Sequence, residues 1–139
     1  MELSLQTADA MAARAVSEAS VRFRRPVCVA VCDQDGFLLA FSRMDGAPAR
    51  SIRISQCKAY TAARMGVDTS AFNERLHRED VPASAFCDDQ FTQLPGGSVL
   101  KDGDRIIGGV GISGLAPSED QAISEMLAGM AGQPPILST

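Results

Sequence analysis

Three glycines near the C-terminal end of the chain constrain the fold most strongly. Gly109, Gly111 and Gly114, within GGVGISG at 108–114, have the G-x-G-x-x-G spacing of a dinucleotide-binding loop. Such a loop joins a strand to a helix, and a second parallel strand follows with an acidic residue about 20 residues further on. Here a helical stretch fills most of the 25 residues after Gly114, and only QPPILST remains. The sequence therefore excludes a dinucleotide-binding fold.

The same glycines lie in a strand pattern, where glycine lowers stability relative to a residue with a side chain. This loss of stability is expected where another part of the protein or a ligand must come close to the backbone. The pattern allows close packing by a helix, and it equally allows a ligand or a neighbouring subunit. Both interpretations stay open at the level of sequence.

The rest of the chain reads as helices alternating with two hairpins. An Ala-rich helix is predicted over 7–23, with Thr7 as its N-cap, and its small apolar residues recur at helical spacing. A hairpin over 27–44, with its turn at 33–36, comes next, and a helix from Ser51 stopped by Gly66 follows it. A second short helix is begun by Asp68-Thr69 and closed by Pro82, and the stretch over 86–97 is unassigned. The chain then forms a hairpin over 98–113, with Asp102-Gly103 at its tip, and a last helix capped by Ser118 and ended by Gly132.

Hairpins in place of strand–helix–strand crossovers indicate an α+β fold. We expect one domain over 1–139, with an antiparallel sheet of about five strands flanked by helices.

The composition limits the kinds of molecule that the protein is expected to bind. The net charge is −4, and nucleic-acid binding needs a basic face, so nucleic acid is not expected as a partner. No continuous apolar run reaches the length of a membrane span, and the N-terminus does not resemble a signal peptide. These observations predict a cytoplasmic protein without membrane attachment.

The four cysteines are Cys28, Cys32, Cys57 and Cys87. Cys28 and Cys32 are four residues apart in a predicted strand, so about 13 Å separates them, which is too far for a disulfide. They also lack the C-x-x-C spacing of redox and zinc sites. We expect all four to be buried free thiols.

Several linked blocks resemble the GlcG/HbpS family, also called the haem-degrading-domain or PduO C-terminal-domain family. The blocks are VAVCDQDGFLLAFSRMDGA, SIRISQCKAYTAARMGVDT, LPGGSVLKDGDRIIGGVGISG and SEDQAI, which together span about residues 5–130. They are similar to the family's V-D-x-x-G hairpin, R-M-D-G-A loop, K-A-x-T-A helix, x-G-G turn and G-x-I-G-V-S-G strand with an Asp soon after. The resemblance implies a profilin- or PAS-like shape and homo-oligomers, from dimers to octamers. It also implies a small-molecule or cofactor ligand related to haem or a corrinoid.

The residues that match the family blocks form a candidate ligand-binding set. Their charges, hydroxyls and glycine amides suit a carboxylate, such as a haem propionate or a small organic acid, or the side amides of a corrinoid. An alternative is a structural network, in which Arg43 and Asp45 fix the loop and Lys58 pairs across subunits. The set comprises Arg43, Asp45, Ser51, Lys58, Thr61, Thr69, Gly97, Gly109 and Gly111.

A haem ligand is hard to find in this sequence. Some haem-binding relatives use a His on the first helix, but residues 4–23 contain none, and the single histidine, His77, lies in a polar segment. We therefore expect His77 to be a solvated helix residue, and nothing favours Met11 or Met44 as a substitute.

No metal site is expected either, because the His and Cys residues lack ligand spacing. The acidic residues Glu79, Asp80, Asp88 and Asp89 are interpreted as solvated surface.

The residues show no catalytic constellation, since neither serine nor cysteine has an obvious base apart from His77. Three hypotheses remain. The first is a ligand-binding protein with a pocket near Arg43, Lys58 and Gly109. The second is an enzyme acting on a small organic acid through Lys58 or Asp45, and the third is a structural assembly subunit.

Overall fold

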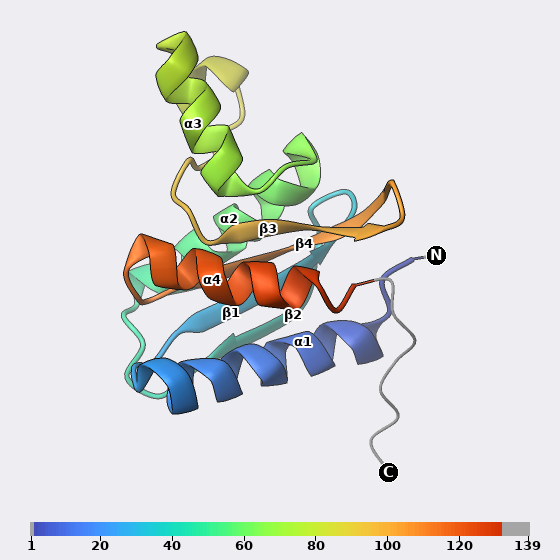
Figure 1. Ribbon diagram of the computed structural model, residues 1–139, viewed down its shortest axis with the longest axis vertical. Coiled ribbons are helices and arrows are strands. Elements are labelled where there is room, and N and C mark those ends of the chain that lie inside the picture. The colour runs from blue at the N-terminus through green and yellow to red at the C-terminus, as the bar shows by residue number, and fades with distance from the viewer. Residues whose placement is uncertain (1, 132–139) are drawn as a thin grey trace.

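A four-stranded antiparallel sheet, with helices on both faces, forms the centre of the structure (Figure 1). The computed structural model describes residues 2–131. Its elements in chain order are α1 (Leu5–Glu18), the π-helical turn η1 (Ala19–Phe23), β1 (Cys28–Asp33), β2 (Leu38–Arg43), α2 (Arg50–Met65), α3 (Thr69–Glu79), the 3-10 turn η2 (Ala83–Phe86), β3 (Gly97–Asp102), β4 (Arg105–Ser113) and α4 (Pro117–Ala128).

The sheet consists of two hairpins joined by their inner strands. The strand order is β2-β1-β4-β3, and each neighbouring pair is antiparallel. At the centre, Ala30 of β1 lies opposite Gly111 of β4, and Cys32 lies opposite Gly109. The predicted α+β class with an antiparallel sheet is confirmed.

Residues 2–131 contain four strands, against the expectation of about five. The unassigned stretch forms η2 and coil, because side chains satisfy its backbone in place of a neighbouring strand. The Thr92 N–H donates to Thr61 Oγ1 at 3.0 Å, and the Gln90 N–H donates to Asp88 Oδ1 at 3.0 Å. The rings of Phe86 and Phe91 pack with Phe72 of α3, which ties this stretch to that helix.

One face of the sheet carries large apolar side chains. Val29 and Val31 of β1 and Val110 and Ile112 of β4 are fully buried against α1 and α4. Figure 1 shows these two helices side by side across this face. Because successive residues of a strand point to opposite faces, the residues between these four belong to the other face.

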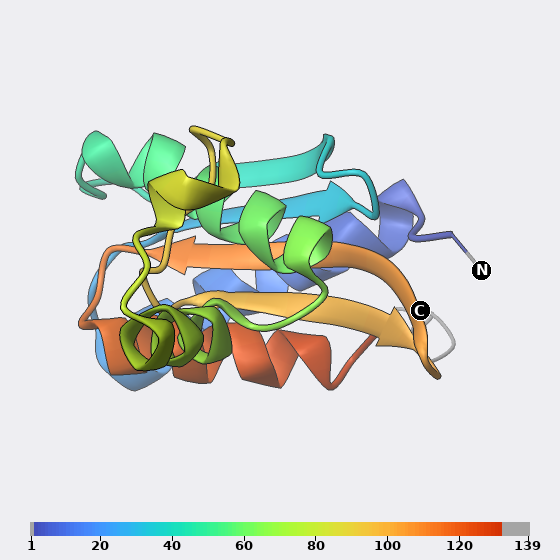
Figure 2. The ribbon, with the colours of Figure 1, turned by 90° about the horizontal axis from the view of Figure 1, so that it is seen from above.

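The other face carries very small side chains. Ala30 and Cys32 of β1 pack against Ala59 and Ala63 of α2. Small residues on both elements let the helix backbone come close to the strands. Figure 2 views the same molecule from above, nearly down the axis of α3, which projects away from the sheet in Figure 1.

The first helix begins and ends differently from the prediction. Ser4, not Thr7, is the N-cap, and its side chain accepts the Thr7 N–H at 3.1 Å. The α-helix stops at Glu18, and η1 continues to a left-handed Arg24 with φ of 55°. The predicted helix over 7–23 therefore comprises an α-helix and a π-helical turn.

The remaining caps are partly as expected. Gly66 ends α2 in a left-handed conformation and Asp68 is the N-cap of α3, as predicted. The last helix starts earlier than Ser118, because the Glu119 carboxylate accepts the Ala116 N–H at 3.1 Å and Ala116 becomes the N-cap. The predicted stop at Gly132 lies outside the described residues. Within residues 2–131, no helix is both long and apolar enough to cross a membrane.

Candidate functional site

The glycines of β4 face a helix. A Cβ on Gly111 would lie 2.6 Å from the Ala59 backbone nitrogen and closer still to the Ser55 carbonyl oxygen. A Cβ on Gly109 would likewise collide with the Ala59 carbonyl oxygen. The close approach inferred from the sequence is thus made by α2, which covers both glycines and leaves them no face open to a ligand.

Lys58 is the most buried charged residue of the predicted set. It lies on α2 with 3% of its surface exposed. Its Nζ donates to the Ile112 carbonyl oxygen at 2.7 Å and to Asp120 Oδ2 at 3.1 Å. The proposed pairing of Lys58 across subunits is therefore corrected, because the partner is Asp120 of the same chain.

Asp120 lies in the first turn of α4 and is equally buried. Its second oxygen, Oδ1, accepts the Leu115 N–H at 3.1 Å. Burial lowers the pKa of the Lys58 ammonium, and burial raises the pKa of the Asp120 carboxyl, in each case against the effect of the other charge. The geometry of two hydrogen bonds per group favours the ionised pair, so we treat Lys58 and Asp120 as a buried salt bridge.

A pocket of about 140 Å³ adjoins this pair. Arg50 and Ser51 of α2 form part of its wall, and the Ser113 hydroxyl donates to Ser51 Oγ at 3.1 Å. The lining residues are Arg50, Ser51, Ile54, Lys58, Leu94, Pro95, Ser113, Gly114, Leu115, Pro117 and Asp120. Of the nine predicted site residues, Ser51 and Lys58 meet here.

Thr61, Thr69 and Gly97 serve the fold. Thr69 Oγ1 accepts the Gly97 N–H at 2.9 Å, and both residues are buried. Thr61 Oγ1 donates to the Cys57 carbonyl oxygen at 2.7 Å. The Thr69–Gly97 contact holds the start of β3 against α3, and Thr61 Oγ1, which also accepts the Thr92 N–H, holds the coil before β3 against α2.

Arg43 and Asp45 lie at a separate hollow of about 460 Å³, which they share with Val16, Ser42 and Met44. Arg43 donates through Nη2 to the Ala47 carbonyl oxygen at 3.0 Å, which closes the loop after β2. Asp45 is exposed and makes no ion pair with Arg43 within the described residues. Arg43 thus fixes the loop as the structural alternative expected, but through a carbonyl group and not through Asp45.

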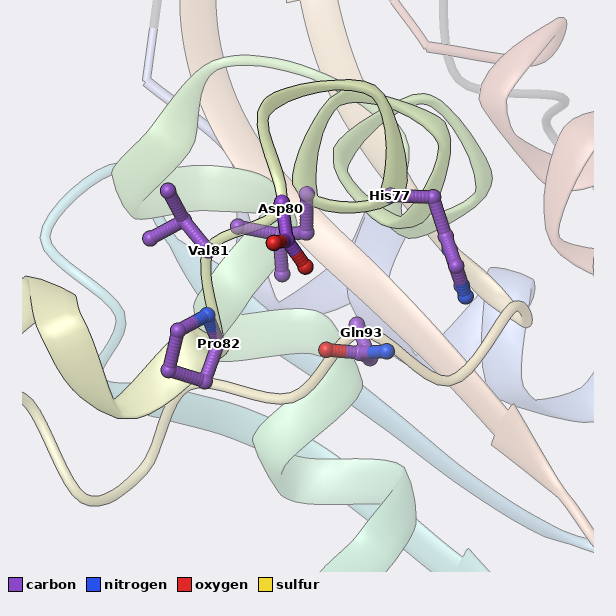
Figure 3. Close-up of a pocket in the computed structure, with 6 residues that line it drawn as sticks. His77, Asp80, Val81, Pro82 and Gln93 are labelled. Carbon is purple, nitrogen blue, oxygen red and sulfur yellow. The ribbon is translucent and has the colours of Figure 1, made fainter.

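The single histidine lies at a third pocket, separate from those of Lys58 and Arg43. His77, near the end of α3, is exposed as expected, and it also borders a pocket of about 350 Å³ with Leu76, Asp80, Val81, Pro82 and Gln93. Figure 3 shows His77 on one side of this pocket and Val81 and Pro82 on the other. His77 Nδ1 lies 2.9 Å from the Asn73 carbonyl oxygen. Because a carbonyl only accepts, Nδ1 carries the proton and Nε2 of the neutral ring keeps its lone pair.

The two methionines considered as ligands are both engaged. Met11 is fully buried in the core, and Met44 Sδ accepts the Val27 N–H at 3.3 Å. Within residues 2–131, no three His, Cys, Asp or Glu side chains are arranged to hold a metal ion.

The four thiols differ in their exposure to solvent. Cys28 and Cys32 are buried and free as expected, whereas Cys57 is half-buried and Cys87 is exposed. The expectation of four buried thiols was wrong because η2, which carries the chain into Cys87, lies on the surface.

Sequence reasoning missed Asp120 as a site residue. A signal was present, because the family pattern carries an Asp shortly after the glycine-rich strand. Its partner was not visible, since 62 positions separate it from Lys58.

Known proteins are similar in sequence to most of this chain. Protein GlcG of Escherichia coli (strain K12) is 40% identical over 113 residues, which cover 80% of this chain and 81% of that protein. An uncharacterized 15.0 kDa protein from the dhaT-dhaS intergenic region of Citrobacter freundii is 30% identical over 129 residues, covering 88% of this chain and 87% of the relative.

Solved structures share the fold. A double mutant of HbpS from Streptomyces reticuli superposes with a TM-score of 0.84 at 28% identity, over 96% of this chain and 89% of that one. A PduOC:heme complex superposes with a TM-score of 0.83 over 97% and 99% of the two chains, and at 23% identity this likeness shows the fold alone. A family model described as "Haem degrading protein HbpS-like" matches residues 3–128, and the chain belongs to this family.

Proposed function

We propose that this protein binds haem, with His77 as the protein ligand to the iron. The proposal is supported by membership of a family named for haem degradation and by likeness to a fold that holds haem in the PduOC complex. The observation that carries it is the imidazole of His77 at a pocket wall, with Nδ1 bound to a backbone carbonyl and Nε2 free. The same arrangement orients histidine ligands in metal sites generally.

The residues at this pocket fit the demands of haem in part. Histidine is an axial ligand of haem iron, and Leu76, Val81 and Pro82 supply an apolar wall. The volume of about 350 Å³ lies in the lower part of the range of ligand pockets, about 300–1,000 Å³. A porphyrin edge would therefore extend beyond the pocket. His77 would hold the iron, and haem would supply redox and oxygen chemistry at this pocket.

A haemin titration followed by Soret absorbance tests this function. We expect saturable binding by the wild type and a loss of affinity of at least about tenfold in His77→Ala, because the iron loses its protein ligand. Glu74→Ala, an exposed change on the same helix, is the matched control and keeps wild-type affinity. A flat titration of the wild type contradicts haem binding, and unchanged affinity in His77→Ala contradicts the role of His77.

The predicted corrinoid ligand is tested in the same format with cobalamin. Thr61, Thr69, Gly97, Gly109 and Gly111 are withdrawn from our ligand proposal, because each is occupied by contacts within the fold. Arg43 and Asp45 border a hollow of their own, and ligand binding there stays a prediction beside the loop contact that Arg43 makes with Ala47.

We further propose that the protein is a cytoplasmic homo-oligomer. Large apolar side chains are exposed at the surface, among them Val21 at 75% and Phe37 at 68%. Burial of such side chains is a favourable contribution to subunit contact. Light scattering coupled to gel filtration measures the mass, and a monomer across the micromolar range contradicts this proposal.

A further inference from the structure

We propose that the pocket beside Lys58 and Asp120 is a second binding site, which takes a free short-chain carboxylic acid as its carboxylate. This site is distinct from the His77 pocket and extends the function beyond haem. It is built by the first half of α2, the first turn of α4, the end of β4 and the coil before β3.

Lys58, Arg50 and Ser51 each have a hydrogen-bond donor to spare at this pocket. An ammonium has three N–H bonds, and within residues 2–131 Lys58 has two acceptors, the Ile112 carbonyl oxygen and Asp120 Oδ2. Arg50 makes no hydrogen bond or ion pair in the part of the chain that the structure describes, so its guanidinium is available. Ser51 Oγ accepts from Ser113 and keeps its own hydroxyl proton for donation.

Both carboxylate oxygens of Asp120 are already in use. Asp120 Oδ2 accepts from Lys58, and Asp120 Oδ1 accepts from the Leu115 N–H. The Lys58 and Asp120 charges offset one another, so the charge of Arg50 is the uncompensated one at this pocket. A ligand that only accepts hydrogen bonds and carries a negative charge matches this inventory, and a carboxylate does both.

The rest of the lining is apolar and the space is small. Ile54, Leu94, Leu115 and the rings of Pro95 and Pro117 surround the polar groups. A water occupies about 30 Å³ in the liquid, so 140 Å³ corresponds to about four or five atoms of that size. A carboxylate group has three heavy atoms, so one or two further carbons fit, whereas a tetrapyrrole does not.

The salt bridge supports a binding role as well. Burying two charges costs several kcal/mol of desolvation, and hydrophobic replacement of such pairs is often neutral or stabilising. Lys58 and Asp120 are therefore a costly way to join α2 to α4 if stability alone is served. Their position at the wall of a cavity gives the cation a further use.

Calorimetric titration with acetate, propanoate and butanoate at constant ionic strength tests the site. We expect saturable binding of acetate and propanoate in the millimolar range and weaker binding of butanoate, which exceeds the space. Acetamide and propanamide, which have similar shape without charge, should not bind. Arg50→Gln should weaken binding about tenfold or more, since a hydrogen bond between charged groups is lost. Arg53→Gln removes an exposed arginine one turn along the same helix and should leave the affinity unchanged.

Amide chemical shifts locate the binding. Addition of propanoate should move the amide signals of Ser113, Gly114 and Leu115 and leave those of α3 in place. Absence of saturable binding by the wild type overturns the proposal. Equal weakening in Arg50→Gln and Arg53→Gln also overturns it, because that result indicates general attraction to a basic surface.

A carboxylate can also come from a haem propionate, and the two sources separate experimentally. For a free acid, Arg50→Gln weakens propanoate binding but leaves the haemin isotherm unchanged, and His77→Ala does the opposite. Weakening of haemin alone in Arg50→Gln, without binding of any free acid, assigns the pocket to the propionate and overturns our proposal.

Discussion

Replacement of Gly111 by alanine tests the explanation of the glycine-rich strand most directly. The added Cβ would lie 2.6 Å from the Ala59 nitrogen and 2.9 Å from Lys58 Cβ, with the Ser55 carbonyl oxygen nearer than either. Ordinary van der Waals contact begins at 3.4 Å. The backbone of α2 must therefore retreat by about 0.8 Å at Ala59 and by more at Ser55.

Such a retreat is costly because it opens a gap along a buried helix. A radial gap of about 0.5–1 Å forfeits about a quarter to a half of the dispersion attraction across it. Overpacking typically costs about 1–3 kcal/mol, and the clash here is with backbone atoms that cannot rotate away. We expect Gly111→Ala to cost about 3 kcal/mol and to lower the melting temperature by about 10 °C.

Urea unfolding followed by circular dichroism measures the change as a shift of the midpoint at constant slope. The matched control is Gly103→Ala at the tip of the same hairpin, where no atom of the described residues lies within 4 Å of the added Cβ. Only its left-handed φ of 62° is penalised, at about 1–2 kcal/mol. If Gly111→Ala costs no more than Gly103→Ala, the close approach of α2 does not explain the glycine.

Two further predictions concern buried groups. Lys58→Met leaves Asp120 buried without its cation and should cost about 3–5 kcal/mol in unfolding free energy, whereas Lys58→Met combined with Asp120→Leu should recover most of it. A double mutant as unstable as the single one, in the same urea assay, argues against the ion pair as the cause. Iodoacetamide at pH 8 should modify Cys87 first and spare Cys32, because burial raises the pKa of Cys32 to about 12. Mass spectrometry of the digested protein identifies the modified cysteines, and early labelling of Cys32 contradicts its burial.

The secondary structure was largely predictable because its signals are local. The apolar run before Asp33, the glycine turns and the stop at Gly66 each depend on a few neighbouring residues, and these elements were confirmed. The failures occurred where a distant group takes part. The coil after η2 is held by Thr61, 31 residues earlier, and no local pattern reveals that contact.

The candidate site shows the same limit. Matching family blocks put Arg43, Asp45 and Lys58 in one set, but β2 and α2 carry them to different hollows. Asp120 completes the pocket from α4, 62 positions after Lys58, and its role depends on how α4 packs on the sheet. Sequence can name the polar residues, whereas topology decides which of them meet.

The glycines and the pocket are consequences of one packing arrangement. Lys58 reaches the Ile112 carbonyl oxygen, one residue beyond Gly111, because α2 lies against β4 with no side chain between them. A larger residue at 111 would lift the helix and carry Nζ away from both Ile112 and Asp120. Gly111→Ala should therefore weaken propanoate binding as well as stability, although it touches no pocket residue other than Lys58. Unchanged propanoate affinity in Gly111→Ala would show that the depth of the buried cation does not depend on the glycines of the central strand.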